Sequence, residues 1–98
     1  MNMQQIMAQA QRMQKDIMSK KDQIDSMEFV GKSDWVNVTF MGSKEIKNVN
    51  IVSDDAFDKE NKEILCDMIC LAIKDAMNQI DKVTEEKLGQ YSKMGGLF

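Results

Sequence analysis

Four basic side chains near the N-terminus are of the kind that binds phosphate: Arg12, Lys15, Lys20 and Lys21. Lysine and arginine contact the phosphates of a nucleic-acid backbone through charge, and such contacts need no sequence code. The alternative is a solvated helix face with local pairing, for instance between Lys21 and Asp25 one helical turn later. These residues therefore indicate either a binding surface for a polyanion or an ordinary polar face.

A second basic group lies near the C-terminus and consists of Lys82, Lys87 and Lys93. Cations at the end of a helix also complement the helix dipole, so a structural role competes here with a DNA contact. The group becomes a candidate for DNA binding only if the fold brings it beside the first basic group.

Other reactive side chains are few. The chain has no histidine, so the commonest general base and the commonest metal ligand in proteins are missing. Cys66 and Cys70 stand four residues apart and would supply half of a zinc site, which needs four ligands. We expect them to be reduced thiols buried at a dimer contact. The sequence therefore predicts no enzyme, no metal, no cofactor and no small-molecule substrate.

Charge is distributed unevenly along the 98 residues, whose formal net charge is −3. Residues 53–67 hold most of the acidity, whereas residues 1–27 are slightly basic. Local potential decides where a polyanion can approach, so the acidic balance does not exclude DNA as a partner.

The apolar residues of the first 27 positions predict a long, narrow amphipathic helix. A heptad seam with one polar member follows alternating steps of three and four: Met3, Ile6, Ala10, Met13, Ile17, Lys20, Ile24 and Met27. A stripe this narrow suits a helix that lies along one partner more than one sunk in a broad core. We expect this helix to project, at least in part, from the rest of the protein.

The period changes after residue 27 and predicts three strands. The first covers 28–31, the second covers 36–41 with alternating apolar residues, and the third covers 46–51. In the third strand the alternation slips between Ile46 and Val49, which indicates a bulge or a register offset.

A second long helix is predicted from about Lys59 to Leu88, with Asp58 as its N-cap. Gly89 is expected at the C′ position that ends it, and residues 90–98 as a loose tail. The predicted fold is α+β: a helix, a three-stranded antiparallel sheet and a long helix, in a single domain spanning 1–98.

Burial is expected at seven apolar positions, in the core or at a dimer contact: Val36, Val38, Phe40, Ile51, Leu65, Ile69 and Ile73. A chain this short buries only a modest fraction of its surface, so dimerisation would stabilise it. No segment has the length and apolarity of a membrane span, and the N-terminus has no apolar signal region. We therefore expect a cytoplasmic protein.

Four stretches together resemble the YbaB/EbfC family of bacterial nucleoid-associated proteins. Residues 6–14 are similar to the N-terminal helix of the family, residues 36–42 to its central strand and turn, and residues 46–51 to its third strand. Its long C-terminal helix is similar to residues 65–76, Asn78 and residues 84–89. The likeness covers nearly the whole chain in the right order.

This resemblance implies a tweezer-like homodimer whose projecting helical arms engage double-stranded DNA with little sequence preference. It implies no enzymatic activity and no cofactor, and it suggests replication or recombination proteins as further partners in the nucleoid. Arg12 matches a position that is usually basic in the family, so it is the best single candidate for a DNA contact.

A rival hypothesis from another class is a protein-interaction module. In that case the heptad seam, with the off-seam residues Met7 and Met18, would dock a helix of another protein and DNA would play no role. The two hypotheses differ in whether Arg12, Lys15 and the C-terminal lysines share a surface while the acidic residues 53–67 face away.

Overall fold

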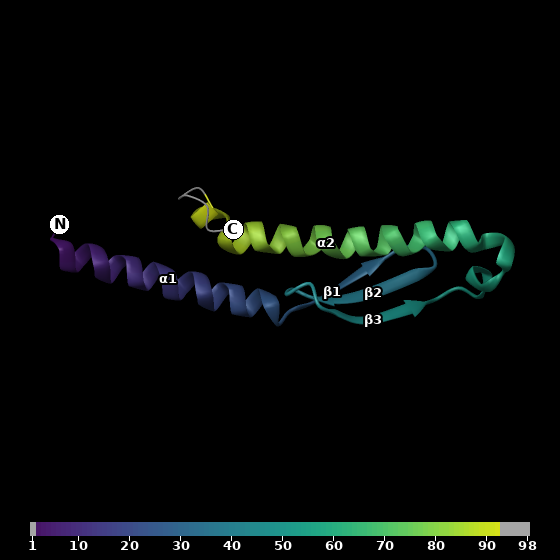
Figure 1. Ribbon diagram of the computed structural model, residues 1–98, viewed down its shortest axis with the longest axis horizontal. Coiled ribbons are helices and arrows are strands. Elements are labelled where there is room, and N and C mark those ends of the chain that lie inside the picture. Colours follow the sequence, from purple (N-terminus) through teal and green to yellow (C-terminus); the bar gives the residue numbers. More distant parts are fainter. Residues whose placement is uncertain (1, 93–98) are drawn as a thin grey trace.

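In the computed structural model, which describes residues 2–92, one long helix lies along a three-stranded sheet and another extends away from its end (Figure 1). In chain order the elements are α1 (Met3–Asp25), β1 (Glu28–Lys32), β2 (Val36–Met41), β3 (Ile46–Ile51), the 3-10 turns η1 (Asp54–Phe57) and η2 (Lys59–Asn61), and α2 (Lys62–Ser92). The predicted α+β class and the order of its elements are confirmed.

The sheet is antiparallel throughout, with strand order β1-β2-β3. Between β2 and β3 the register shifts, because Thr39 pairs with Asn48 whereas Phe40 pairs with Ile46. Lys47 is therefore the extra residue of a bulge, and the slip predicted in the third strand is confirmed.

The core lies between the sheet and α2, which packs on β1 and β2. Val36 and Val38 of β2 are fully buried, as are Ala72 and Ala76 of α2. The helix approaches β1 so closely that a Cβ atom at Gly31 would lie 2.0 Å from the carbonyl oxygen of Ala72. Glycine and alanine at these positions let backbone pack against backbone.

The other residues predicted to be buried differ in how much of the side chain is exposed. Phe40 is buried in the core. Leu65, Ile69 and Ile73 are half-buried and pack against the core from α2, and Ile51 at the end of β3 is also half-buried. These four side chains keep apolar surface that the single chain does not cover.

The predicted ends of the second helix are partly wrong. Gly89 is buried inside α2 rather than at a C′ position, and the helix continues to Ser92. Residues 90–92 of the predicted tail are therefore helical, and residues 93–98 lie outside the described residues. At the other end, the Asp58 carboxylate accepts a hydrogen bond from the backbone N–H of Glu60, so it caps η2, which leads directly into α2.

The molecule is elongated, with extents of 70 × 20 × 15 Å. α1 runs antiparallel to α2, and its N-terminal half extends beyond the end of α2 (Figure 1). We refer to residues 2–15, which precede the contact between the two helices at Asp16 and Tyr91, as the arm.

Candidate nucleic-acid interface

The arm is a regular helix that begins with a side-chain cap. The Asn2 side chain accepts a hydrogen bond from the backbone N–H of Gln5 at 2.9 Å, which satisfies one of the free donors at the helix start. Glutamine, methionine and alanine fill most of the positions that follow and favour a helix on their own.

The heptad seam is buried at one position and half-buried at three. Ile24 is buried, at 3% exposure, where α1 meets the rest of the fold. Met13, Ile17 and Lys20 are half-buried, whereas Ile6 is exposed and Met3 is 73% exposed. The arm therefore presents an apolar stripe as well as its polar faces to solvent.

Arg12 and Lys15 are both exposed near the base of the arm. Three residues apart on a helix, they are neighbours on one side of α1. Residues 2–15 include no aspartate or glutamate. Neither Arg12 nor Lys15 takes part in the ion pairs found among residues 2–92, which join Lys20 to Asp16 and Lys47 to Glu28. Both cations are thus available to a polyanion.

Lys21 is exposed too, but it lies on another face of α1. At 100° per residue it is about 180° from Arg12 around the helix axis, so a single surface cannot contact both. The alternative pairing of Lys21 with Asp25 is not among the ion pairs of the described residues. Lys21 therefore belongs to the solvated surface of α1, away from the Arg12 face.

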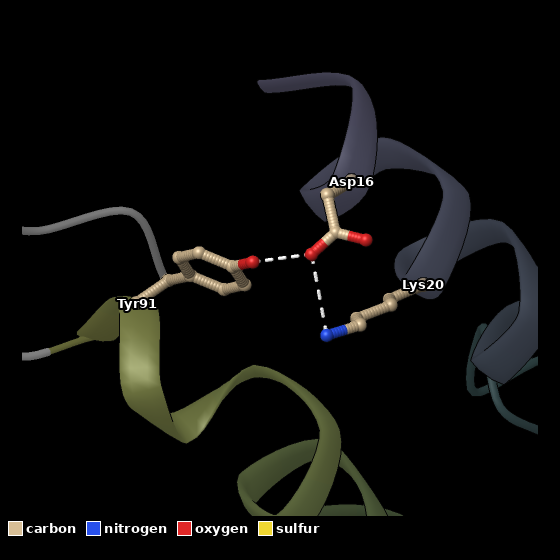
Figure 2. A network of polar contacts seen from close by, with 3 residues as sticks. All are labelled: Asp16, Lys20 and Tyr91. Atoms are coloured by element: carbon tan, nitrogen blue, oxygen red, sulfur yellow. Dashed lines mark hydrogen bonds and ion pairs between the residues drawn. The ribbon is translucent and has the colours of Figure 1, made fainter. Parts of the chain in front are cut away.

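Lys20 is held in a polar cluster between the two helices (Figure 2). Its ammonium group lies 3.2 Å from a carboxylate oxygen of Asp16, and 5.5 Å from the centre of the Tyr91 ring. The Tyr91 hydroxyl donates a hydrogen bond to the same carboxylate oxygen. We call Asp16, Lys20 and Tyr91 the clasp.

The clasp perturbs both of its acidic groups. The hydrogen bond from Tyr91, together with Lys20, lowers the pKa of Asp16 below its ordinary value. The same hydrogen bond to Asp16 raises the pKa of Tyr91. At neutral pH Asp16 is therefore ionised and Tyr91 protonated, which are the two forms that the hydrogen bond between them requires. The Asp16 carboxylate is also the counter-ion of Lys20.

The C-terminal lysines within the described residues, Lys82 and Lys87, differ in exposure. Lys87 is half-buried and stands four residues before Tyr91, so it lies on the face of α2 that is turned toward the base of α1. Lys82 is exposed. Lys93 lies outside the described residues.

The acidic residues 53–67 lie at the end of the molecule opposite the arm (Figure 1). They occupy η1, η2 and the first turns of α2, whereas the tip of the arm lies at the other end of the 70 Å axis. The uneven charge of the sequence is thus a separation of charge in space.

Cys66 and Cys70 are free thiols, and both are exposed on α2 in the single chain. Within residues 2–92, no group of three or more histidine, cysteine or acidic side chains is placed to hold a metal ion. No helix in this part of the chain combines the length and apolarity needed to span a membrane.

Comparison with known proteins assigns the chain to a family, because the model of the YbaB/EbfC DNA-binding family matches residues 1–96. The chain belongs to this family. The resemblance found in the sequence is thereby confirmed, and the chain is a member of a family of nucleoid-associated DNA-binding proteins.

Similar proteins agree with this assignment. A nucleoid-associated protein of Lactococcus lactis subsp. cremoris is 46% identical over 95 residues, which cover 95% of each chain. One from Enterococcus faecalis is 36% identical and covers 94% of this chain and 89% of its own. An uncharacterized Helicobacter pylori protein of known crystal structure has the same fold, with a TM-score of 0.73 at 21% identity; the match covers 97% of this chain and 99% of that one.

Sequence reasoning named Lys20 as a DNA contact and missed Asp16 and Tyr91. Asp16 stands four residues before Lys20, a spacing at which a helical ion pair forms, so that part of the clasp was readable. Tyr91 gave no such signal, because it is 75 residues from Asp16 in the sequence. In this YbaB/EbfC family member the junction of arm and body is therefore visible only in the folded chain.

Proposed function

We propose that the protein binds double-stranded DNA as a homodimer, mainly through phosphate contacts with little sequence preference. The observation that supports this most strongly is the arm: Arg12 and Lys15 are exposed on a segment without carboxylates, and neither takes part in an ion pair within residues 2–92. Phosphate contacts by side chains of this type supply affinity without reading bases. Two arms would give four such cations, which is enough for weak and salt-sensitive binding.

A second copy of the chain would cover the half of the sheet that α2 leaves open. Cross-strand pairing places Ile46, Val49 and Ile51 of β3 on the same face as the buried residues of β2. α2 packs on β1 and β2, and Ile46 and Val49 remain about half exposed. An apolar strand face open to water beside the core is the kind of surface that a protomer contact removes.

The flank of α2 beside this open surface carries the half-buried residues of the predicted dimer contact. On the opposite flank, Asp75 accepts a hydrogen bond from the backbone N–H of Lys32, and Gln79 donates one to the backbone carbonyl of Val30, so that flank faces β1. Helical geometry turns Ile69 and Ile73 away from β1, toward β3. Their exposed parts and the β3 face would form one continuous dimer surface.

The test is fluorescence anisotropy of a labelled duplex of about 30 base pairs, titrated with protein across a salt series and with unrelated duplexes as competitors. We expect saturable binding that weakens steeply with salt and competes equally with any duplex. A dimer that uses both arms should give a slope of log affinity against log salt of about −4, because each phosphate contact contributes about −0.9.

Three variants, each lacking one positive charge, test where the protein contacts the DNA phosphates. Arg12→Gln and Lys15→Gln should each reduce the salt slope by about 2, one phosphate contact for each arm of the dimer. Lys62→Gln is the matched control, since Lys62 is exposed at the other end of the molecule. Equal effects of all three variants would refute the arm as the contact surface.

In the cell, we infer a cytoplasmic protein associated with the nucleoid that contributes to its organisation, with replication or recombination proteins as further partners. Nucleoid-associated relatives support this inference. Colocalisation of a fluorescent fusion with the chromosome tests it, and an even spread through the cell would contradict it.

The exposed part of the heptad seam favours one alternative, an interaction module that docks a helix of another protein. Met3 and Ile6 lie open on the arm. This function predicts no duplex binding even at low salt, and loss of partner capture when Ile6 is changed to Asp. Duplex binding that survives Ile6→Asp and falls with Arg12→Gln would decide against it.

A further inference from the structure

The arm joins the body of the protein through few contacts. Ile24 is the only residue of α1 that is buried, and it lies at the far end of the helix from the arm. Met13, within the arm, and Ile17, two residues after it, are only half-buried. Apolar contact of this kind is not directional, so by itself it leaves the direction of a helix loosely defined.

The clasp lies where the arm begins. Asp16 is the first residue after the arm, and Tyr91 is on the last turn of α2 (Figure 2). Asp16 accepts from the Tyr91 hydroxyl, and Lys20 both approaches the same oxygen and lies over the Tyr91 ring. Hydrogen bonds depend on angle as well as distance, so a contact of this kind fixes direction.

A small change in the direction of the helix at the clasp produces a large displacement of the arm tip. The 14 residues of the arm extend about 20 Å at a rise of 1.5 Å per residue. A tilt of about 10° at the base would therefore move the tip by about 3.5 Å, more than the length of a hydrogen bond. The direction of the arm decides whether its cations meet the phosphates of a duplex.

We propose that Tyr91, acting through Asp16, is a positioning residue that sets the direction of the arm for DNA binding, and that Lys20 belongs to this clasp instead of contacting phosphate. The part that concerns DNA rests on the proposed function. The part that concerns the direction of the arm does not, because it is a property of the protein alone.

The direction of the arm is measured by electron spin resonance between two nitroxide labels. Gln4→Cys on the arm and Asp81→Cys on α2 supply exposed label sites in a background with Cys66→Ser and Cys70→Ser. Dilution into unlabelled protein restricts the measured pairs to single protomers. We expect Tyr91→Phe, which removes only the hydroxyl, to broaden the distance distribution and shift its mean.

A hydroxyl deleted elsewhere on α2 provides the matched control. The Thr84 hydroxyl donates to the carbonyl oxygen of Ile80 within the same helix, at 2.8 Å. Thr84→Val should therefore leave the distance distribution as in the parent protein. An unchanged distribution in Tyr91→Phe, or an equal change in Thr84→Val, would overturn the proposal.

DNA titrations of the same variants test the part of the proposal that concerns DNA binding. If the arm holds the competent direction only a third to a tenth of the time, affinity falls about threefold to tenfold. We expect this loss in Tyr91→Phe and in Lys20→Gln, with the salt slope nearly that of the parent, whereas Arg12→Gln lowers the slope. A slope lowered as much by Lys20→Gln as by Arg12→Gln would show a phosphate contact and refute the role given to Lys20.

The two failures are distinguishable. If the parent protein binds no duplex, the proposed function is wrong, and the spin-label distances still decide whether the clasp sets the arm. If the distances change and affinity does not, the clasp does not position the arm for DNA and the proposal is refuted, while the proposed function stands.

Discussion

One cross-strand pair of valines offers a direct test of burial and of the dimer surface. Val38 of β2 and Val49 of β3 are partners in the register and face the same side of the sheet. Val38 has no exposed surface in the protomer, whereas Val49 is 49% exposed. Substituting each valine in turn with alanine removes the same two methyl groups from two neighbouring sites, one buried and one half-exposed.

The magnitudes follow from those exposures. Val38→Ala should cost about 2–3 kcal/mol, since two buried carbon groups contribute about 1.6 kcal/mol in transfer and a closed cavity adds to this. In an isolated protomer, Val49→Ala should cost only about 0.8 kcal/mol, because half of the side chain is already in water. If a second protomer covers Val49, the cost per protomer rises to about 2 kcal/mol.

Urea unfolding followed by the fluorescence of Trp35 measures these costs, since it is the single tryptophan and packs against the core. Titrations at two protein concentrations a hundredfold apart reveal the dimer: two-state dimer unfolding shifts by about 2.7 kcal/mol between them. A free energy independent of concentration, with Val49→Ala near 0.8 kcal/mol, would refute cover of β3 by a second protomer. A cost below about 1 kcal/mol for Val38→Ala would refute the assignment of the core.

Three further predictions concern glycine and the clasp. Gly31→Ala should lower the free energy of unfolding by about 1–3 kcal/mol, because its Cβ would meet α2 backbone at 2.0 Å. Gly89→Ala should instead raise it by up to about 1 kcal/mol in the same urea titration, since the three atoms nearest to the added Cβ belong to the movable carboxylate of Glu85 and the site is in a helix interior. Ultraviolet absorbance of Tyr91, the single tyrosine, should titrate above pH 10.0 and return toward that value in Asp16→Ala. Because the pKa of Tyr91 is raised, the stability that this group contributes is complete below pH 10.0 and is lost as the pH rises above that value. Because the pKa of Asp16 is lowered, the stability that this group contributes is complete above pH 3.8 and is lost as the pH falls below that value.

The helices and strands could be predicted well from the sequence because the apolar residues of each element recur at a spacing typical of its type. The alternating residues of 36–41 and the three-four steps of α1 are local patterns that tertiary contacts do not override. Even the bulge at Lys47 could be anticipated from the slip in β3. These features depend on neighbours in the sequence, so one chain is enough to see them.

The end of α2 was mispredicted for a physical reason. A glycine after a long apolar stripe is usually the residue that ends a helix, and Gly89 has that setting. Here the chain continues for three more helical residues, and the hydrogen bond of Tyr91 to Asp16 holds the last turn against α1. No local pattern could reveal a contact between positions 16 and 91, and the position of Lys20 beside Tyr91 was hidden for the same cause.

Separation of charge explains how a chain with a net charge of −3 can belong to a family that binds DNA. At 0.1 M salt the Debye length is about 10 Å, so charges further apart than this hardly influence one another through water. The arm cations and the acidic residues 53–67 lie toward opposite ends of a 70 Å molecule. A duplex at the arm would therefore meet the local potential of Arg12 and Lys15, and the acidic end would stay outside its range. The elongated shape therefore makes a nucleic-acid surface at one end compatible with an acidic sequence.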